Sequence, residues 1–73
     1  MNFGDALNEL RYKDCEYMFL PTWKEDVKIK LQTSDENSKM TAPYLYVDSR
    51  FGKVPWNPTQ IELLSEDWET ADD

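Results

Sequence analysis

The residues of this chain best suited to ligand chemistry are its tryptophans, beginning with Trp23. Trp23 follows Pro21 in a predicted turn, where a large ring has little core to enter unless a ligand or a partner subunit supplies one. As a stacking surface for a nucleotide base, such a ring contributes about 1–3 kcal/mol. An equally weighted interpretation is a tryptophan that folds back on a sheet or is buried between subunits. Lys24 follows it and places a positive charge beside the ring.

A second candidate site lies where Pro55 and Trp56 lead into a predicted helix. The free amides and the positive dipole end of a helix N-terminus favour a bound phosphate. Thr59 and Gln60 would add hydrogen-bond donors there. The sequence therefore allows an anion site that combines an aromatic ring with a helix end.

The structural interpretation of the same segment is the stronger of the two. Asn57 is expected to cap the helix, Pro58 to occupy its first position, and Gln60 to complete a capping box with Asn57. Trp56 and Ile61 would then form a hydrophobic staple. Because this arrangement uses much of the same set of residues for stability, the anion site is the minority interpretation.

Tyr44 and Tyr46 alternate along a predicted strand and form an aromatic face. That face is suited to stacking on bases, and equally to ordinary packing across strands or between subunits. Cys15 is expected to be a small buried residue in a strand.

Catalysis and metal binding are poorly supported by the composition. Cys15 is the single cysteine and there is no histidine, so the usual zinc ligand sets and most nucleophilic relays cannot be assembled. The acidic residues Glu62, Glu66 and Asp67 have no spacing that implies a metal or glycosidase site. We therefore expect neither an enzyme nor a cofactor.

The chain has 73 residues and a formal net charge of −7. No apolar run is long enough to span a membrane, so a soluble, intracellular protein with no membrane association is expected. The negative charge argues against direct binding to nucleic acid and favours basic partners. Three Trp, four Tyr and three Phe exceed what so small a core can cover, which favours self-association.

Periodicity predicts one α+β domain over residues 1–73, with two helices on one face of a small antiparallel sheet. Asn2 would cap the first helix, and Ile61, Leu64 and Trp68 recur at helical spacing in the second. Residues Thr33 to Thr41 are expected to form an exposed, mobile loop. The predicted elements are a helix at about 3–12, strands at about 15–20, 25–32, 43–48 and 52–56, a helix at about 58–65 and a short strand at about 67–70.

Several motifs, spread over both ends and the middle of the chain, resemble one family. They are Met1-Asn2-Phe3-Gly4-Asp5-Ala6-Leu7 with Leu10, Trp23, Pro43-Tyr44-Leu45, Gly52, Val54-Pro55-Trp56, Thr59-Gln60, Leu63-Leu64 and Glu66-Asp67-Trp68. The sequence resembles the small phage family of Thoeris anti-defence proteins of the second type. The closing motif is the specific part, because no generic helix requires Pro-Trp, Thr-Gln and Asp-Trp at this spacing.

This resemblance implies a homo-oligomer, a homotetramer or homodimer, that acts in the host cytoplasm as a phage sponge. It would sequester cyclic ADP-ribose isomers or cyclic dinucleotides without cleaving them. By position, it implicates Trp23, Trp56, Thr59 and Gln60 in ligand binding. The family usually has an arginine three residues before the turn tryptophan and Asn-Gly after it, where this chain has Leu20 and Lys24-Glu25.

A second hypothesis is an acidic protein-interaction inhibitor of a host defence enzyme, such as a CRISPR nuclease, which some relatives are linked to inhibiting. The missing arginine and the acidic segment from Glu66 to Asp73 favour this hypothesis. The retained tryptophans and Gln60 favour the sponge.

Overall fold

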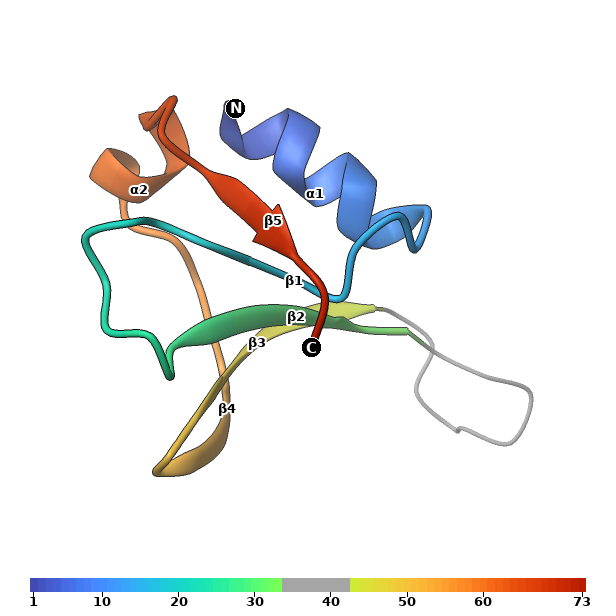
Figure 1. The fold of residues 1–73 in the computed structure, drawn as a ribbon, viewed down its shortest axis with the longest axis vertical. Coiled ribbons are helices and arrows are strands. Elements are labelled where there is room, and N and C mark those ends of the chain that lie inside the picture. The colour runs from blue at the N-terminus through green and yellow to red at the C-terminus, as the bar shows by residue number, and fades with distance from the viewer. Residues whose placement is uncertain (34–42) are drawn as a thin grey trace.

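The computed structural model describes residues 1–33 and 43–73 and shows a five-stranded antiparallel sheet with two helices on one side (Figure 1). The spatial order of the strands is β4-β3-β2-β1-β5, so the last strand pairs with the first. This confirms the predicted α+β fold. The elements in chain order are α1 (Phe3–Arg11), β1 (Tyr17–Phe19), β2 (Lys28–Gln32), β3 (Tyr44–Ser49), β4 (Gly52–Pro55), α2 (Gln60–Leu64) and β5 (Glu69–Ala71).

Helix α1 begins directly after its N-cap residue, Asn2. The side chain of Asn2 accepts a hydrogen bond from the backbone N–H of Asp5, and Asp5 also places a negative charge at the positive end of the helix. Ala6 and Leu10 lie one turn apart and are buried against the sheet. The predicted helix at 3–12 corresponds to α1.

The register of β2 and β3 divides the sheet into two different faces. Ile29 pairs with Val47 on the face that α1 covers, whereas Lys30 pairs with Tyr46 on the opposite face. Because side chains alternate along a strand, every second residue of each strand points away from both helices. We call this second surface the open face. Its side chains are Tyr17, Phe19, Lys28, Lys30, Gln32, Tyr44, Tyr46, Asp48, Lys53 and Pro55.

Trp68 is the largest fully buried side chain and lies between α2 and β5. Its indole N–H donates to the carbonyl oxygen of Glu62 at 2.8 Å, which satisfies the polar atom of the ring in the core. Its backbone N–H and carbonyl exchange hydrogen bonds with the carbonyl and the terminal ammonium of Met1, both at 2.9 Å. Met18 and Ile29 are the other large fully buried residues.

The predicted start of α2 was wrong. Thr59, not Asn57, is the N-cap: its hydroxyl accepts from the N–H of Glu62, and the Glu62 carboxylate accepts from the N–H of Thr59. This is a capping box of the Thr-x-x-Glu type, which is a better match to the motif than Asn57 with Gln60. Asn57 and Pro58 therefore precede the helix.

The apolar contacts predicted for α2 were also wrong. Ile61 is 85% exposed and Leu64 is 78% exposed, and α2 has no buried residue. Trp56 packs on Phe3 instead of forming a staple with Ile61. Trp68 lies beyond the end of the helix, although the sequence spacing placed it on the helical stripe.

Other element boundaries differ by one to three residues from the predicted ranges. Cys15 is buried but precedes β1, because the chain first leaves α1 through Lys13, whose φ of 61° is left-handed. Strand β2 begins at Lys28 because the preceding residues form a turn in which the N–H of Val27 donates to the carbonyl of Lys24. The loop predicted for Thr33 to Thr41 lies, except for its first residue, outside the described residues.

Candidate functional site

The predicted ligand-binding tryptophans belong to one aromatic cluster in the covered face of the sheet. The rings of Trp23 and Trp56 each pack edge to face on the buried ring of Trp68, with centroid distances of 5.4 and 6.1 Å. They also contact each other at 6.2 Å, and Phe3 closes the cluster. Trp23 and Trp56 are both only half-buried, so each ring contributes to the core and retains an exposed part.

The exposed part of Trp56 borders a depression between α1 and the edge of the sheet. We call it the Trp56 groove. Its volume is about 400 Å³, within the range of small-molecule sites. Among the described residues, Arg11 supplies the one charged side chain of its lining. The lining residues are Leu7, Arg11, Leu31, Pro43, Tyr44, Leu45, Pro55, Trp56, Asn57 and Pro58.

The chemistry of the Trp56 groove suits a planar anion. Trp56 offers aromatic surface, Asn57 offers an amide that both donates and accepts, and Arg11 offers a guanidinium whose donors match two oxygens of a phosphate. Sequence reasoning did not identify Arg11 as a site residue. A usable signal was its position one turn after Leu7, on the apolar side of α1, in the last turn of the helix.

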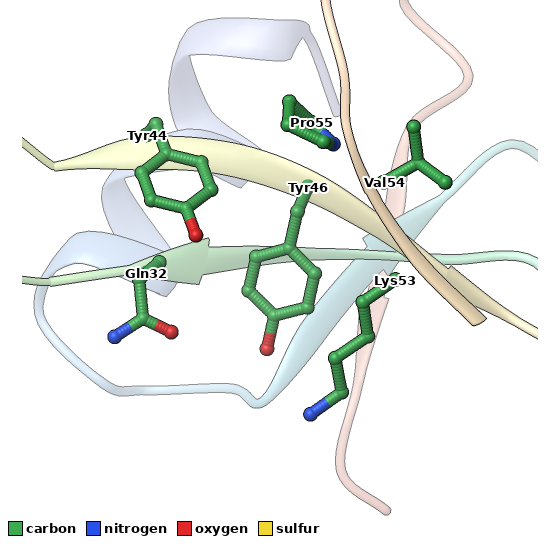
Figure 2. Close-up of a pocket in the computed structure, with 6 residues that line it drawn as sticks. All are labelled: Gln32, Tyr44, Tyr46, Lys53, Val54 and Pro55. Atoms are coloured by element: carbon green, nitrogen blue, oxygen red, sulfur yellow. The ribbon is translucent and has the colours of Figure 1, made fainter.

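Tyr44 and Pro55 also border a second, smaller depression on the open face, the tyrosine pocket (Figure 2). The rings of Tyr44 and Tyr46 lie 6.3 Å apart, and Figure 2 shows both projecting to the same side as Gln32 and Lys53. The ammonium of Lys53 lies 5.8 Å from the ring centroid of Tyr46, which is a cation–π distance. With a volume of about 60 Å³, the tyrosine pocket holds only a small group, and it shares the lining residues Tyr44 and Pro55 with the Trp56 groove.

Trp23 and Lys24 line a different depression, together with Tyr17, Phe19 and Glu25. This depression does not share a lining residue with the Trp56 groove. The two depressions are therefore separate, with Tyr44, Pro55 and Trp56 in the lining of one and Trp23 and Lys24 in that of the other, although the rings of Trp23 and Trp56 contact each other in the aromatic cluster.

Thr59 and Gln60 line none of these depressions. The N–H and the hydroxyl of Thr59 are engaged by Glu62, and the carboxylate of Glu62 stands where an anion would bind to the helix end. The helix end is therefore already neutralised by the chain itself.

Electrostatic pairing is concentrated on the open face. The Asp73 carboxylate accepts hydrogen bonds from the ammonium groups of Lys28 and Lys30, which lower the pKa of Asp73 to about 2. Near the β3–β4 turn, a hydrogen bond from the Arg50 guanidinium lowers the pKa of Asp26 to about 2. On the covered side, burial raises the pKa of the Cys15 thiol, which keeps it protonated and unreactive at neutral pH.

Within residues 1–33 and 43–73, no three His, Cys, Asp or Glu side chains come together as a metal site. Over the same ranges, no helix has both the length and the apolar character needed to cross a bilayer.

Comparison with known families identifies the relationship that these features suggested. The family model Tad2-like, described as the Thoeris anti-defense 2-like domain, matches residues 1–71. The chain belongs to this family. No curated protein matches the chain. Membership in the Tad2-like family supports an anti-defence role against the Thoeris system, and it agrees with the resemblance that the sequence motifs indicated.

Proposed function

We propose that this Tad2-like protein is a non-enzymatic sponge that binds a cyclic nucleotide immune signal in the Trp56 groove and holds it intact. The observation that carries the proposal is the composition of the groove, in which the aromatic ring of Trp56 and a single guanidinium belong to the lining of one depression. Cyclic ADP-ribose isomers and cyclic dinucleotides combine planar bases with phosphates, so both parts of the groove have a counterpart in the ligand. Family membership supports the same biological role.

Each groove residue has a distinct task in this proposal. Arg11 pairs with phosphate oxygens, and a hydrogen bond of this charged type contributes about 1.5–3 kcal/mol. Trp56 stacks on a base and contributes about 1–3 kcal/mol. Asn57 binds a base edge or ribose hydroxyl through its amide. The Trp56 ring needs no reordering on binding, because its contacts with Phe3, Trp23 and Trp68 already fix it.

The lining of the groove favours sequestration over cleavage. It contains no carboxylate, histidine or cysteine among the described residues, so a general base would have to be supplied by Tyr44 alone. A sponge acts stoichiometrically, since one site removes one signal molecule. The dissociation constant must therefore lie below the signal concentration.

Self-association is part of the proposal. Large apolar side chains remain exposed in the single chain, including Phe51 at 88% and Ile61 at 85%. Tyrosines also line the open face, which no helix of the described chain covers. A homodimer or homotetramer would cover such surfaces and would multiply the number of signal sites per particle.

The decisive experiment combines a thermal-shift screen with calorimetry. Cyclic ADP-ribose isomers and cyclic dinucleotides are screened first, because a ligand that binds only the folded protein raises Tm. For the ligand found, Arg11→Gln should weaken binding about tenfold or more. Arg50→Gln is the matched control, since it removes the same charge far from the groove. Equal affinities of Arg11→Gln and the unaltered protein would refute the proposed site.

Cleavage is tested on the same complex. The ligand is incubated with the protein, released by heat denaturation and analysed by chromatography. Recovery of the intact ligand is expected, whereas a hydrolysed product would identify an enzyme.

A specific observation favours the acidic interaction inhibitor as the second candidate. The exposed side chains of Ile61 and Leu64 on α2 lie among the carboxylates of Glu62, Glu66 and Asp67. An apolar patch with an acidic rim suits a basic protein surface. Its signature is a complex with a host defence enzyme that weakens as salt increases, and that Ile61→Ser disrupts while Arg11→Gln does not.

A further inference from the structure

The terminal strand β4 has an outer edge that no described helix or strand covers. It is the last strand at its end of the sheet, and among the described elements it contacts only β3. All four of its residues are exposed. An uncovered strand edge presents backbone N–H and C=O groups that can pair with a strand of another molecule.

The hydrogen bonds of β4 identify which backbone groups point outward. The N–H of Trp56 donates to the carbonyl oxygen of Leu45 on β3 at 3.0 Å. Because the backbone groups of a strand alternate between its two edges, Val54 also directs its N–H and C=O toward β3, whereas Lys53 and Pro55 direct theirs away from the sheet. Pro55 has no N–H. The outer edge therefore offers the N–H of Lys53 as a donor and the carbonyl oxygens of Lys53 and Pro55 as acceptors.

We propose that the outer edge of β4 binds an extended segment of a partner protein, which joins the sheet as an antiparallel strand and carries a carboxylate opposite Lys53. We call this segment the added strand. In such complexes the backbone hydrogen bonds supply affinity and the side chains supply selectivity. The edge is independent of the sponge proposal, because Lys53 does not line the Trp56 groove.

The charge of Lys53 selects the chemistry of the added strand. Lys53 lies opposite Asp48 in the register of β3 and β4, yet the Asp48 carboxylate pairs with Lys30 at 3.3 Å. The Lys53 ammonium lies 5.8 Å from the ring centroid of Tyr46 and forms no ion pair with any described residue. Since opposite charges directly across an antiparallel pair are stabilising, an acidic side chain is the matching neighbour for Lys53.

Exposed apolar side chains define the rest of the added strand. Val54 is 54% exposed, and Figure 2 shows Val54 and Lys53 leaving β4 in different directions. Phe51, in the turn before β4, is also exposed. Apolar residues on either side of the central carboxylate of the added strand would pack on Val54, because side chains alternate between the two faces of a strand. The expected partner segment is therefore extended, with a carboxylate between apolar residues.

The alternative role for Lys53 and Pro55 is protection of the edge. Lysine and proline are common on edge strands, where they prevent pairing with other chains. The two roles predict different binding preferences. A protective lysine disfavours every added strand, whereas a recognition lysine favours an acidic strand over a basic one.

The test is an NMR titration of the full chain with the peptide acetyl-Thr-Val-Glu-Val-Thr-amide. The N–H of Lys53 should become protected from hydrogen exchange, because it gains an acceptor in the added strand. Replacing the peptide glutamate by lysine should weaken binding about two- to fivefold, and Lys53→Glu should reverse this preference. Equal affinity of the unaltered protein for the two peptides, or the same order of affinities in Lys53→Glu, would overturn the proposal.

The matched control variant is Lys24→Glu, which makes the same charge change on an exposed lysine outside β4. It should leave the preference for the acidic peptide unchanged. A reversal in Lys24→Glu as large as that in Lys53→Glu would show that net charge, and not the edge of β4, selects the peptide.

Backbone methylation of the peptide tests the strand pairing itself. A methyl group on the glutamate nitrogen removes the hydrogen bond to the Lys53 carbonyl and should abolish binding. A methyl group on the nitrogen of the following valine, which points away from β4, should change the affinity by less than about twofold. Equal affinities of the two methylated peptides would overturn the proposal. An unprotected Lys53 N–H at saturation, or amide shifts confined to the Trp56 groove, would do so as well.

Discussion

The two helices have similar sequence patterns and opposite environments. Helix α1 is capped by Asn2 and buries Ala6 and Leu10 against the sheet. Helix α2 is capped by a reciprocal box between Thr59 and Glu62, yet it buries no side chain. Amphipathic spacing therefore indicates that a helix will pack on something, but it does not say whether the partner lies within the same chain.

Trp68 explains the difference between the helices. Its ring is 0% exposed and contacts Phe3, Trp23 and Trp56, so it fills the part of the core that α2 would otherwise enter. Helix α2 is held at this position through its Glu62 carbonyl, which accepts from the Trp68 indole. The apolar residues of α2 are consequently left outside, available to a partner.

The largest expected effect comes from comparing one leucine of each helix. Leu10→Ala should lower the free energy of unfolding by about 2–5 kcal/mol, because it opens a cavity in the core. Leu64→Ala should change it by less than about 0.5 kcal/mol, since Leu64 is 78% exposed. Urea denaturation followed by circular dichroism measures both. Comparable decreases in the free energy of unfolding would show that Leu64 is buried in an assembly and would contradict the difference expected between the two helices.

Trp68→Phe should have the next largest effect. The substitution keeps an aromatic ring but removes the indole N–H, which leaves the Glu62 carbonyl without its donor and a small cavity behind. We expect a loss of about 1–3 kcal/mol. Amide exchange should accelerate more in α2 than in α1, and equal acceleration would show that α2 does not depend on this bond.

The caps should give a smaller effect. Thr59→Ala removes the hydroxyl that accepts from Glu62, and Asn2→Ala removes the acceptor for Asp5, so each should cost about 1 kcal/mol. Asn57 lies two residues before the N-cap of α2, so Asn57→Ala should leave the free energy of unfolding nearly unchanged. Thermal unfolding of the three variants checks this. A larger loss for Asn57→Ala than for Thr59→Ala would contradict the observed helix start.

The smallest expected effect concerns two carboxylates that lie outside both helices, those of Asp26 and Asp73. The pKa of Asp26 and that of Asp73 are lowered to about 2 in the folded protein, below the ordinary value near 4. Their stabilising contribution is therefore present above pH 4 and lost as the pH falls from about 4 to about 2. The double variant Asp26→Asn and Asp73→Asn should flatten this part of the pH profile, measured by urea midpoints. An unchanged slope would exclude these carboxylates as its source.

Much of the fold followed from local sequence rules. The alternation of Lys28, Ile29, Lys30 and Leu31 predicts a strand with one charged and one apolar face, and the structure has this arrangement. The cap at Asn2 could be predicted because it directly precedes the apolar series of Phe3, Ala6, Leu7 and Leu10. At α2, Asn57 and Thr59 both have side chains that can cap a helix. The observed N-cap is Thr59, because Glu62 and not Gln60 completes the capping box.

The candidate site was less predictable than the fold. Tyr44, Pro55 and Trp56 were expected to contribute, and the structure places them around one groove. Arg11 could not be assigned to the groove, because its distance from Trp56 in the sequence gives no indication of contact in space. Likewise, the ion pairs of Lys28 and Lys30 with Asp73 join positions that only the pairing of β5 with β1 brings together.

The reciprocal hydrogen bonds between Met1 and Trp68 have a consequence for protein synthesis. Trp68, whose indole completes the core, is translated after the residues it packs against. Strand β5, which flanks β1, is translated after Trp68. While residue 68 is still inside the ribosomal tunnel, α1 and the central strands lack the side chain around which they pack. The core can therefore close only after Trp68 has emerged, and a product truncated before residue 68 should be a target for proteolysis.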